Sequence, residues 1–186
     1  LYSSNMVVRK RLDIKGRALA FVTITVTDWI PAFSDRGLAG LAVEQLAESL
    51  QFYHVAAVGY VLMPSHLHLL LGFQSIELLS KFVQSYKILT SKRVKNLLQD
   101  PSGPNRRSLL MRFDDGGRFT FWKPRFDDLI IVSEEQFRVK LNYIHNNPVN
   151  AGLVVAPEQW VYSSASAWLR NIEGPIPIDK SFAWLV

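Results

Sequence analysis

Two of the four histidines in the chain, His66 and His68, lie one residue apart in an apolar run. Successive side chains of a β-strand point to opposite faces, so a strand here would place both imidazoles on one face of a sheet. Neutral imidazole is the commonest metal ligand in proteins, and one shared cation would satisfy both rings. The spacing therefore predicts half of a metal site. The alternative is a pair of core histidines, each hydrogen-bonded to the backbone.

A second set of reactive residues follows Ser133. The four residues from Ser133 match a capping box, which predicts a helix that runs to about Asn147, before Pro148. Tyr143 and Asn147 are four residues apart and so share a face of this helix. The Asn147 amide oxygen could complete a metal site beside the Tyr143 phenol, whereas His145 should point away. The alternative is that Tyr143 is a buried helix tyrosine.

The elements that must position these residues follow the order β-α-β-β-α-β. Strands are expected at residues 18–27, 55–62, 66–73 and 118–132, the last bent near Pro124, and amphipathic helices at 38–52 and 75–98. Residues 99–117 are expected to form a loop, and a short helix is expected at 163–169. This order predicts an α+β, ferredoxin-like split βαβ fold, with an antiparallel four-stranded sheet, helices on one face and the Tyr143 helix after it.

Composition limits the classes of protein that the chain can represent. With 186 residues and 48% hydrophobic residues, it is long enough for one packed domain. We divide it into a basic N-terminal extension (1–17), a main domain (18–155) and a C-terminal tail (156–186). The absence of cysteine excludes disulfides, thiol catalysis and cysteine-ligated zinc, and makes the cytoplasm the default location. No apolar stretch has the length of a membrane span.

The charge balance suits a polyanionic partner. Lys and Arg total 21 against 16 Asp and Glu, which gives a net charge of +5. Aromatic residues near position 122 could stack on bases, although aromatics in a strand more often pack in the core. Each basic residue alone is more often a solvated surface charge, whereas the set as a whole favours phosphate contacts. The candidate DNA-binding residues are Lys81, Lys87, Lys92, Arg93, Arg106, Arg107, Trp122, Arg125 and Lys140.

Two segments carry a family resemblance. Residues Met63 to His68, together with Asn142 to Val154, resemble the single-tyrosine transposase superfamily with the His-hydrophobic-His (HUH) signature. Within that superfamily, these residues and the segment 121–126 are similar to the REP-associated tyrosine transposases. The resemblance extends over about residues 15–165. Two positions depart from the family pattern: Ser65 stands where Asn is common, and Asn147 where many relatives have Gln.

The resemblance implies a metal-dependent endonuclease and strand transferase that acts on single-stranded or hairpin DNA, as a monomer or homodimer. Tyr143 would be the nucleophile, forming a 5′-phosphotyrosine link and freeing a 3′-hydroxyl. His66 and His68 would hold Mg²⁺ or Mn²⁺, with Asn147 as third ligand. The chemistry agrees, because a free phenol ionises only near pH ~10 and needs a cation to activate the phosphate.

Two other functions are compatible with the sequence. The chain could be a DNA or RNA hairpin-binding protein of the same fold that has lost catalysis. It could also be a metal-dependent phosphoesterase that activates water, in which case Tyr143 would not be needed for turnover.

Overall fold

The computed structural model describes residues 15–100, 103, 105–114 and 116–184. The predicted N-terminal extension falls outside this range except for its last three residues, 15–17. Among the described residues, no helix combines the length and the apolar character that crossing a lipid bilayer requires.

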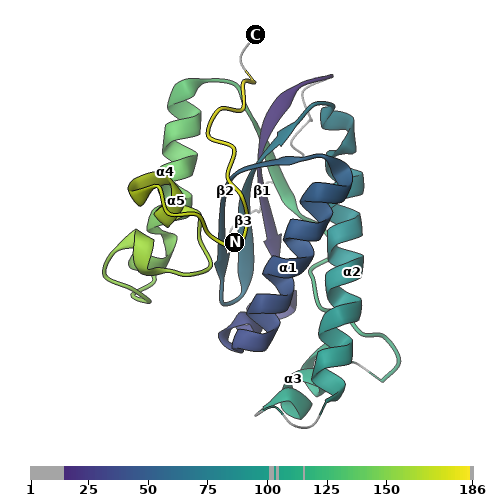
Figure 1. Ribbon diagram of the computed structural model, residues 1–186. Coiled ribbons are helices and arrows are strands. Elements are labelled where there is room, and N and C mark those ends of the chain that lie inside the picture. The colour runs from purple at the N-terminus through teal and green to yellow at the C-terminus, as the bar shows by residue number, and fades with distance from the viewer. Residues whose placement is uncertain (1–14, 101–102, 104, 115, 185–186) are drawn as a thin grey trace, which may run out of the picture.

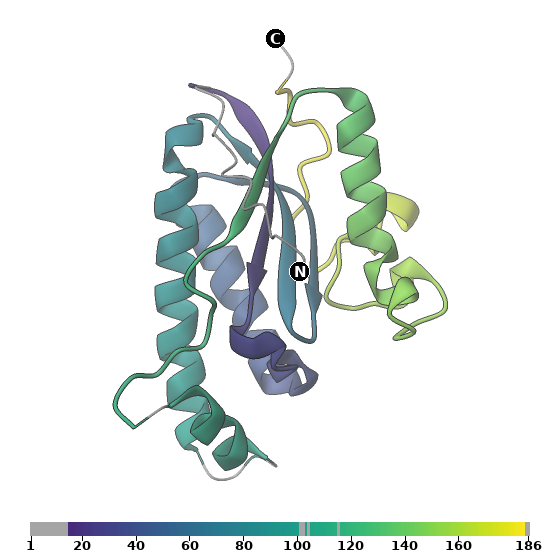
Figure 2. The same ribbon diagram turned by 180° about the vertical axis from the view of Figure 1, so that it is seen from behind.

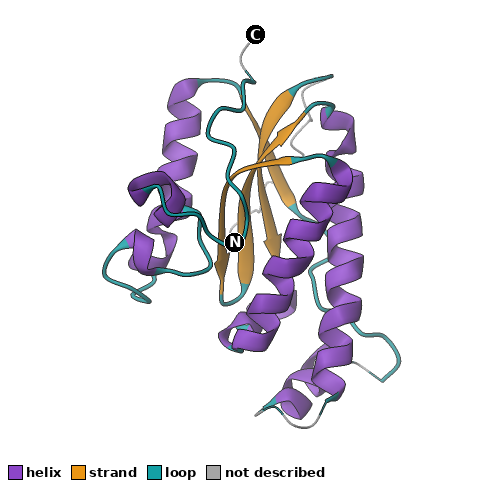
Figure 3. Ribbon diagram, in the orientation of Figure 1, coloured by secondary structure: helices purple, strands orange, loops and turns teal. Residues whose placement is uncertain are grey.

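The centre of the fold is a four-stranded antiparallel sheet, drawn in orange in Figure 3. Its strands are β1 (Ala18–Thr25), β2 (Ala56–Met63), β3 (His66–Phe73) and β4 (Asp127–Ile131). They lie in the order β2-β3-β1-β4, so β1 and β3 are central, and every neighbouring pair is antiparallel. This order confirms the predicted ferredoxin-like split βαβ arrangement.

Helices cover both faces of the sheet. The helices α1 (Arg36–Tyr53) and α2 (Leu79–Gln99) pack side by side on one face (Figure 1). The helix α4 (Glu134–Asn150) lies on the other face against β2 and β3, and α5 (Ala165–Arg170) lies beside it near the edge of β2, as the reverse view also shows (Figure 2). The sheet therefore separates the α1 and α2 layer from the helix that carries Tyr143.

The alternation of β3 divides its side chains between two cores. Leu67, Leu69 and Leu71 belong to the core beneath α1 and α2. Leu70 belongs to the second core, which includes Leu141 of α4. Because His66 and His68 share the parity of Leu70, they lie on the α4 face, as the period of two predicts.

Three predicted elements differ from the structure. The expected loop at 99–117 is wrong, since α3 (Arg106–Phe113) forms there and buries Phe113 in the core. The fourth strand is restricted to β4, and the preceding residues make only isolated bridges, such as Val26 with Trp122. The predicted helix end before Pro148 is also wrong, because α4 continues to Asn150, with backbone bonds closing its last turn beyond the proline.

The C-terminal segment, residues 156–184, is integrated into the fold. It runs along the outer edge of β2, where Ser163 forms a bridge with Val61 and the Tyr162 carbonyl accepts from the Leu62 amide at 2.8 Å. The indole of Trp168 donates to the Val58 carbonyl at 2.8 Å. The edge strand is therefore covered by the chain's own residues.

Candidate active site

The histidine pair and Tyr143 meet on one side of the sheet. Tyr143 Oη lies 3.4 Å from His68 Nε2, although the two residues are 75 positions apart. Their ring centroids are 5.1 Å apart, and the phenol side is open to solvent, with Tyr143 45% exposed. The geometric part of the prediction is confirmed: α4 brings the phenol to the imidazoles. The chemical roles of these residues stay predictions.

Each histidine has a hydroxyl partner at Nδ1. Thr23 Oγ1 lies 2.8 Å from His68 Nδ1, and Ser65 Oγ lies 3.2 Å from His66 Nδ1. The two imidazole centroids are 4.7 Å apart, and His68 also stacks on Phe21 with centroids at 5.5 Å. If each Nδ1 carries the proton, each Nε2 keeps its lone pair for a ligand, an assignment inferred from the hydrogen-bond network.

Burial keeps both imidazoles neutral at physiological pH. It lowers the pKa of His66 to about 4. The pKa of His68 falls to about 3, first through burial and then through the nearby His66 and Lys140. Neutral imidazoles with oriented rings are the form that binds a metal ion, so the pair fits a cation without having to lose protons first.

The predicted third metal ligand, Asn147, belongs to α4. Within the described ranges, no group of three or more His, Cys, Asp or Glu residues lies close enough to hold a metal ion. Asn147 is half-buried one helical turn beyond Tyr143 in α4. Its amide remains the predicted third ligand, and phosphate or water oxygens would supply the rest of the coordination.

Lys140 belongs to the same site. Its Nζ lies 4.6 Å from the centroid of the Phe21 ring and 5.7 Å from that of Tyr143. The ammonium therefore lies beside the two aromatic rings, Phe21 and Tyr143, that also contact His68.

Three of the predicted phosphate contacts have partners within the fold. Arg93 forms ion pairs with Glu44 at 3.2 Å and Glu48 at 3.1 Å, which join α2 to α1. Arg106 is only 14% exposed and lies 3.3 Å from Asp100. The charges of these two arginines already have carboxylate partners, which argues against the predicted phosphate contacts at both positions.

Lys87 is the third. Its Nζ donates to the carbonyls of Lys123 at 2.7 Å and Pro124 at 2.9 Å, and burial lowers its pKa. The ammonium thus fixes the segment that precedes β4. The other predicted basic residues, Lys81, Lys92, Arg107 and Arg125, are exposed and remain available to a polyanion.

The predicted base-stacking residue Trp122 is not accessible. Its side chain is 4% exposed and packs against Phe33 and Phe121 in the core beneath α2. The buried Trp122 ring is therefore not available to stack on a base. Sequence reasoning missed Trp29, whose ring is 55% exposed and meets the His66 ring at 5.4 Å. The sequence did contain a signal for this residue: Trp29 lies in a predicted turn, where no neighbouring strand would cover its ring.

His145 points away from the site, as predicted. It is buried, and its Nε2 lies 2.9 Å from Ser164 Oγ. The same hydroxyl accepts from the Tyr60 amide at 3.0 Å and donates to the Tyr60 carbonyl at 3.2 Å. This histidine therefore ties α4 and the C-terminal segment to β2, and burial lowers its pKa to about 4.

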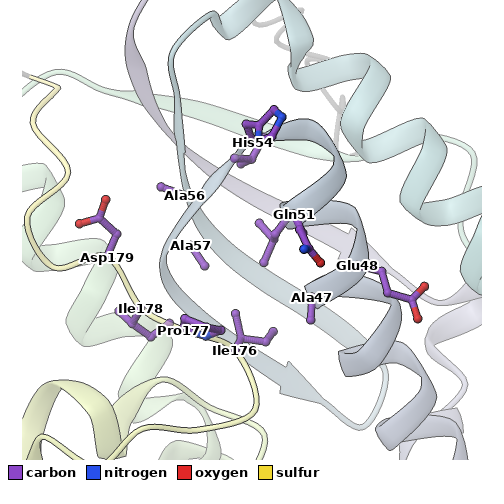
Figure 4. Close-up of a pocket in the computed structure, with 12 residues that line it drawn as sticks. Ala47, Glu48, Gln51, His54, Ala56, Ala57, Ile176, Pro177, Ile178 and Asp179 are labelled. Atoms are coloured by element: carbon purple, nitrogen blue, oxygen red, sulfur yellow. The ribbon is translucent and has the colours of Figure 1, made fainter.

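A separate hollow of about 690 Å³ opens between the end of α1, the start of β2 and residues 176–179 (Figure 4). None of the residues at the histidine pair lines it. Its charged lining residues include the carboxylates of Glu48 and Asp179, which disfavour a phosphate. This hollow does not extend the candidate active site.

Comparisons with known proteins support the class of fold. No protein-family model matches the chain, and no curated protein matches it. Among solved structures, the chain is similar to a REP-associated tyrosine transposase bound to a REP hairpin, with a TM-score of 0.63 and 17% identity over 92% of each chain. The chains thus share a fold over nearly their whole length, and the predicted resemblance is confirmed at that level.

A second solved structure is that of a candidate transposase from Deinococcus radiodurans. It is similar with a TM-score of 0.46 and 20% identity over 74% of this chain and 96% of that one.

Proposed function

We propose that the chain is a REP-associated type of single-tyrosine transposase, a metal-dependent enzyme that nicks and rejoins single-stranded DNA. The observation that carries the proposal is the 3.4 Å approach of Tyr143 Oη to His68 Nε2 at an exposed surface. Since the structurally similar transposase is bound to a REP hairpin, hairpin DNA with an unpaired flank is the proposed substrate.

The reaction would be an exchange of phosphodiester bonds. Tyr143 Oη attacks the phosphorus, the phenolic proton passes to solvent, and the bond from phosphorus to the 3′-oxygen breaks. That oxygen takes up a proton and leaves as a 3′-hydroxyl, while the 5′-phosphate stays on the tyrosine. The link preserves the bond for rejoining to another 3′-hydroxyl. Lys140, near the phenol ring, would stabilise the charge of the attacking oxygen.

His66 and His68 would hold Mg²⁺ or Mn²⁺, with Asn147 as the proposed third ligand. The cation would polarise the scissile phosphate and stabilise the charge of the transition state. The hydroxyls of Ser65 and Thr23 keep the imidazoles in the orientation that presents Nε2. Two nitrogen ligands suit Mn²⁺ better than Mg²⁺, so we expect higher activity with Mn²⁺.

The test uses an end-labelled hairpin oligonucleotide with unpaired flanks, incubated with the protein and Mn²⁺. The expected product is a covalent protein-DNA adduct on a denaturing gel, which Tyr143→Phe abolishes. Tyr53→Phe is the matched control, because Tyr53 lies on α1 across the sheet and packs against Phe82. Equal adduct formation by wild type and Tyr143→Phe would remove Tyr143 from the role of nucleophile.

A second candidate is a hairpin-binding protein without catalysis. It is favoured by one observation: the part of the chain that the structure describes gathers no third His, Cys, Asp or Glu at the histidine pair. Binding that is unchanged by EDTA, without cleavage of any hairpin, would support it. Cleavage that survives in Tyr143→Phe would instead support a phosphoesterase that uses water.

A further inference from the structure

A groove of about 460 Å³ adjoins the histidine pair. It is lined by Thr23, Thr25 and Trp29 and by residues 123–127. Thr23 is hydrogen-bonded to His68, and Trp29 meets the ring of His66, so the groove and the candidate active site share a wall. Its volume falls within the roughly 300–1,000 Å³ of typical ligand sites.

The backbone presents Trp29 to this groove. Asp28 and Trp29 both have positive φ, at 52° and 57°. The left-handed conformation is unfavourable for non-glycine residues, and such strain clusters at ligand clamps. The turn is held by bonds from the Thr27 amide to the Phe121 carbonyl and from the Trp29 amide to the Val26 carbonyl, at 2.9 and 3.1 Å. The indole is thereby kept in solvent beside the histidines.

The groove combines this aromatic surface with positive charge. Lys123 Nζ lies 4.6 Å from the centroid of the Trp29 ring, and Arg125 is exposed. Asp127 is the single carboxylate among the residues that line the groove. Two hydrogen bonds fix the backbone of Lys123: its amide donates to the Thr25 carbonyl at 2.8 Å, and its carbonyl accepts from Lys87 Nζ. A flat aromatic ring in a groove that two cations also line matches a nucleotide, whose base stacks while its phosphates pair.

We propose that this groove is a base-binding subsite. An unpaired base of single-stranded DNA next to the scissile phosphate stacks on Trp29, and Lys123 and Arg125 pair with the adjoining phosphates. The inference rests on the proposed function for the kind of substrate. Its test is binding alone, so it can fail or succeed separately from cleavage.

The protein-side test measures the binding of a fluorescent single-stranded flank oligonucleotide by anisotropy, in a Tyr143→Phe background that lacks the proposed nucleophile. Trp29→Ala is expected to weaken binding about tenfold, as stacking contributions of this kind predict. Trp29→Leu keeps apolar bulk without a flat ring and should lose as much, whereas Trp29→Phe should retain most affinity. Phe52→Ala is the control, because Phe52 is a 76% exposed aromatic on α1.

The DNA-side test places an abasic site at each position of the flank in turn. At one position the loss of the base should weaken binding by the Trp29 protein about tenfold, yet leave binding by Trp29→Ala unchanged. Lys123→Gln should lower the salt dependence by about one phosphate contact. The subsite would be overturned if, at every position, the abasic site and Trp29→Ala weakened binding by independent, additive amounts. It would also be overturned if Trp29→Ala bound the oligonucleotide with wild-type affinity.

The two proposals can be told apart by their outcomes. If the effect of one abasic site depends on Trp29, but the wild-type protein forms no adduct at Tyr143, the subsite is supported and the proposed nuclease activity is overturned. An adduct without any such dependence would keep the nuclease and overturn the subsite.

Discussion

Thr23 and His68 face each other across β1 and β3, and the Thr23 hydroxyl lies 2.8 Å from His68 Nδ1. Both residues belong to central strands of the sheet, so their positions are fixed by the sheet itself. The bond directs the other ring nitrogen to Tyr143 Oη. One hydroxyl on β1 therefore sets the orientation of the imidazole that faces the phenol.

The first prediction is that Thr23→Val lowers metal affinity. Valine keeps the shape of threonine and removes the partner of His68 Nδ1, and the loss of such outer contacts typically costs 10- to 100-fold in affinity or activity. Cleavage measured against Mn²⁺ concentration should show a higher half-saturating concentration. Thr120→Val is the control, because Thr120 lines a different hollow and not the groove beside the histidine pair. Identical Mn²⁺ curves for wild type and Thr23→Val would contradict an orienting role.

The second prediction concerns metal binding in the absence of DNA. A ligand at 100 times its dissociation constant stabilises the folded state by about 2.7 kcal/mol. Saturating Mn²⁺ should raise the melting temperature of the wild type, and EDTA should reverse the rise. His66→Ala should lose the effect, while His54→Asn, at the exposed left-handed C-cap of α1, should keep it. A Mn²⁺ shift that persists in His66→Ala would place the metal elsewhere.

The third prediction concerns acid stability. Burial lowers the pKa of His145 to about 4, whereas an unfolded histidine titrates near ~6.5. Between these values the unfolded chain binds a proton that the folded chain does not, so the free energy of unfolding falls as pH drops through this window. One such histidine contributes at most about 1.4 kcal/mol per pH unit.

His145→Gln removes this titration. In urea unfolding between pH 7 and 4, the variant should therefore lose less stability per pH unit than the wild type, even if it is less stable at pH 7. An unchanged slope would mean that His145 binds protons equally in both states.

The fourth prediction separates two neighbouring cations of α2. Lys92 is exposed, whereas Arg93 is paired with Glu44 and Glu48. Lys92→Gln should weaken DNA binding and lower the salt slope by about one. Arg93→Gln should leave the salt slope unchanged and reduce the free energy of unfolding by no more than about 1 kcal/mol, the usual range for exposed ion pairs. Anisotropy titrations at several salt concentrations would measure the salt slope of both variants. An unchanged slope in Lys92→Gln together with a lower slope in Arg93→Gln would contradict these roles.

The sequence predicted the parts of the fold whose cause is local. Alternation in β3 and the three-residue link before it defined a hairpin, and a period of 3.6 defined α1, α2 and α4. The helix α3 was missed because its short apolar pattern lies among glycines and prolines, and its stabilising contacts are tertiary: Phe113 is buried in the core and Arg106 pairs with Asp100.

The convergence of His66, His68 and Tyr143 was predictable from residue types and spacing, whereas the chemical roles of these residues stay predictions. The assignments of Arg93 and Trp122 failed because their partners are distant in sequence. Arg93 pairs with Glu44, 49 residues earlier, and Trp122 is buried against Phe33. Trp29 was missed because its accessibility depends on a backbone conformation that no local pattern specifies.

The segment along the outer edge of β2 has a consequence for any shortened form of the protein. A chain that stopped soon after α4 would display an apolar strand with open amide and carbonyl groups, which is a template for sheet-to-sheet self-association. The segment along β2 thus protects this edge from self-association, and a fusion partner should be attached after the segment rather than replace it.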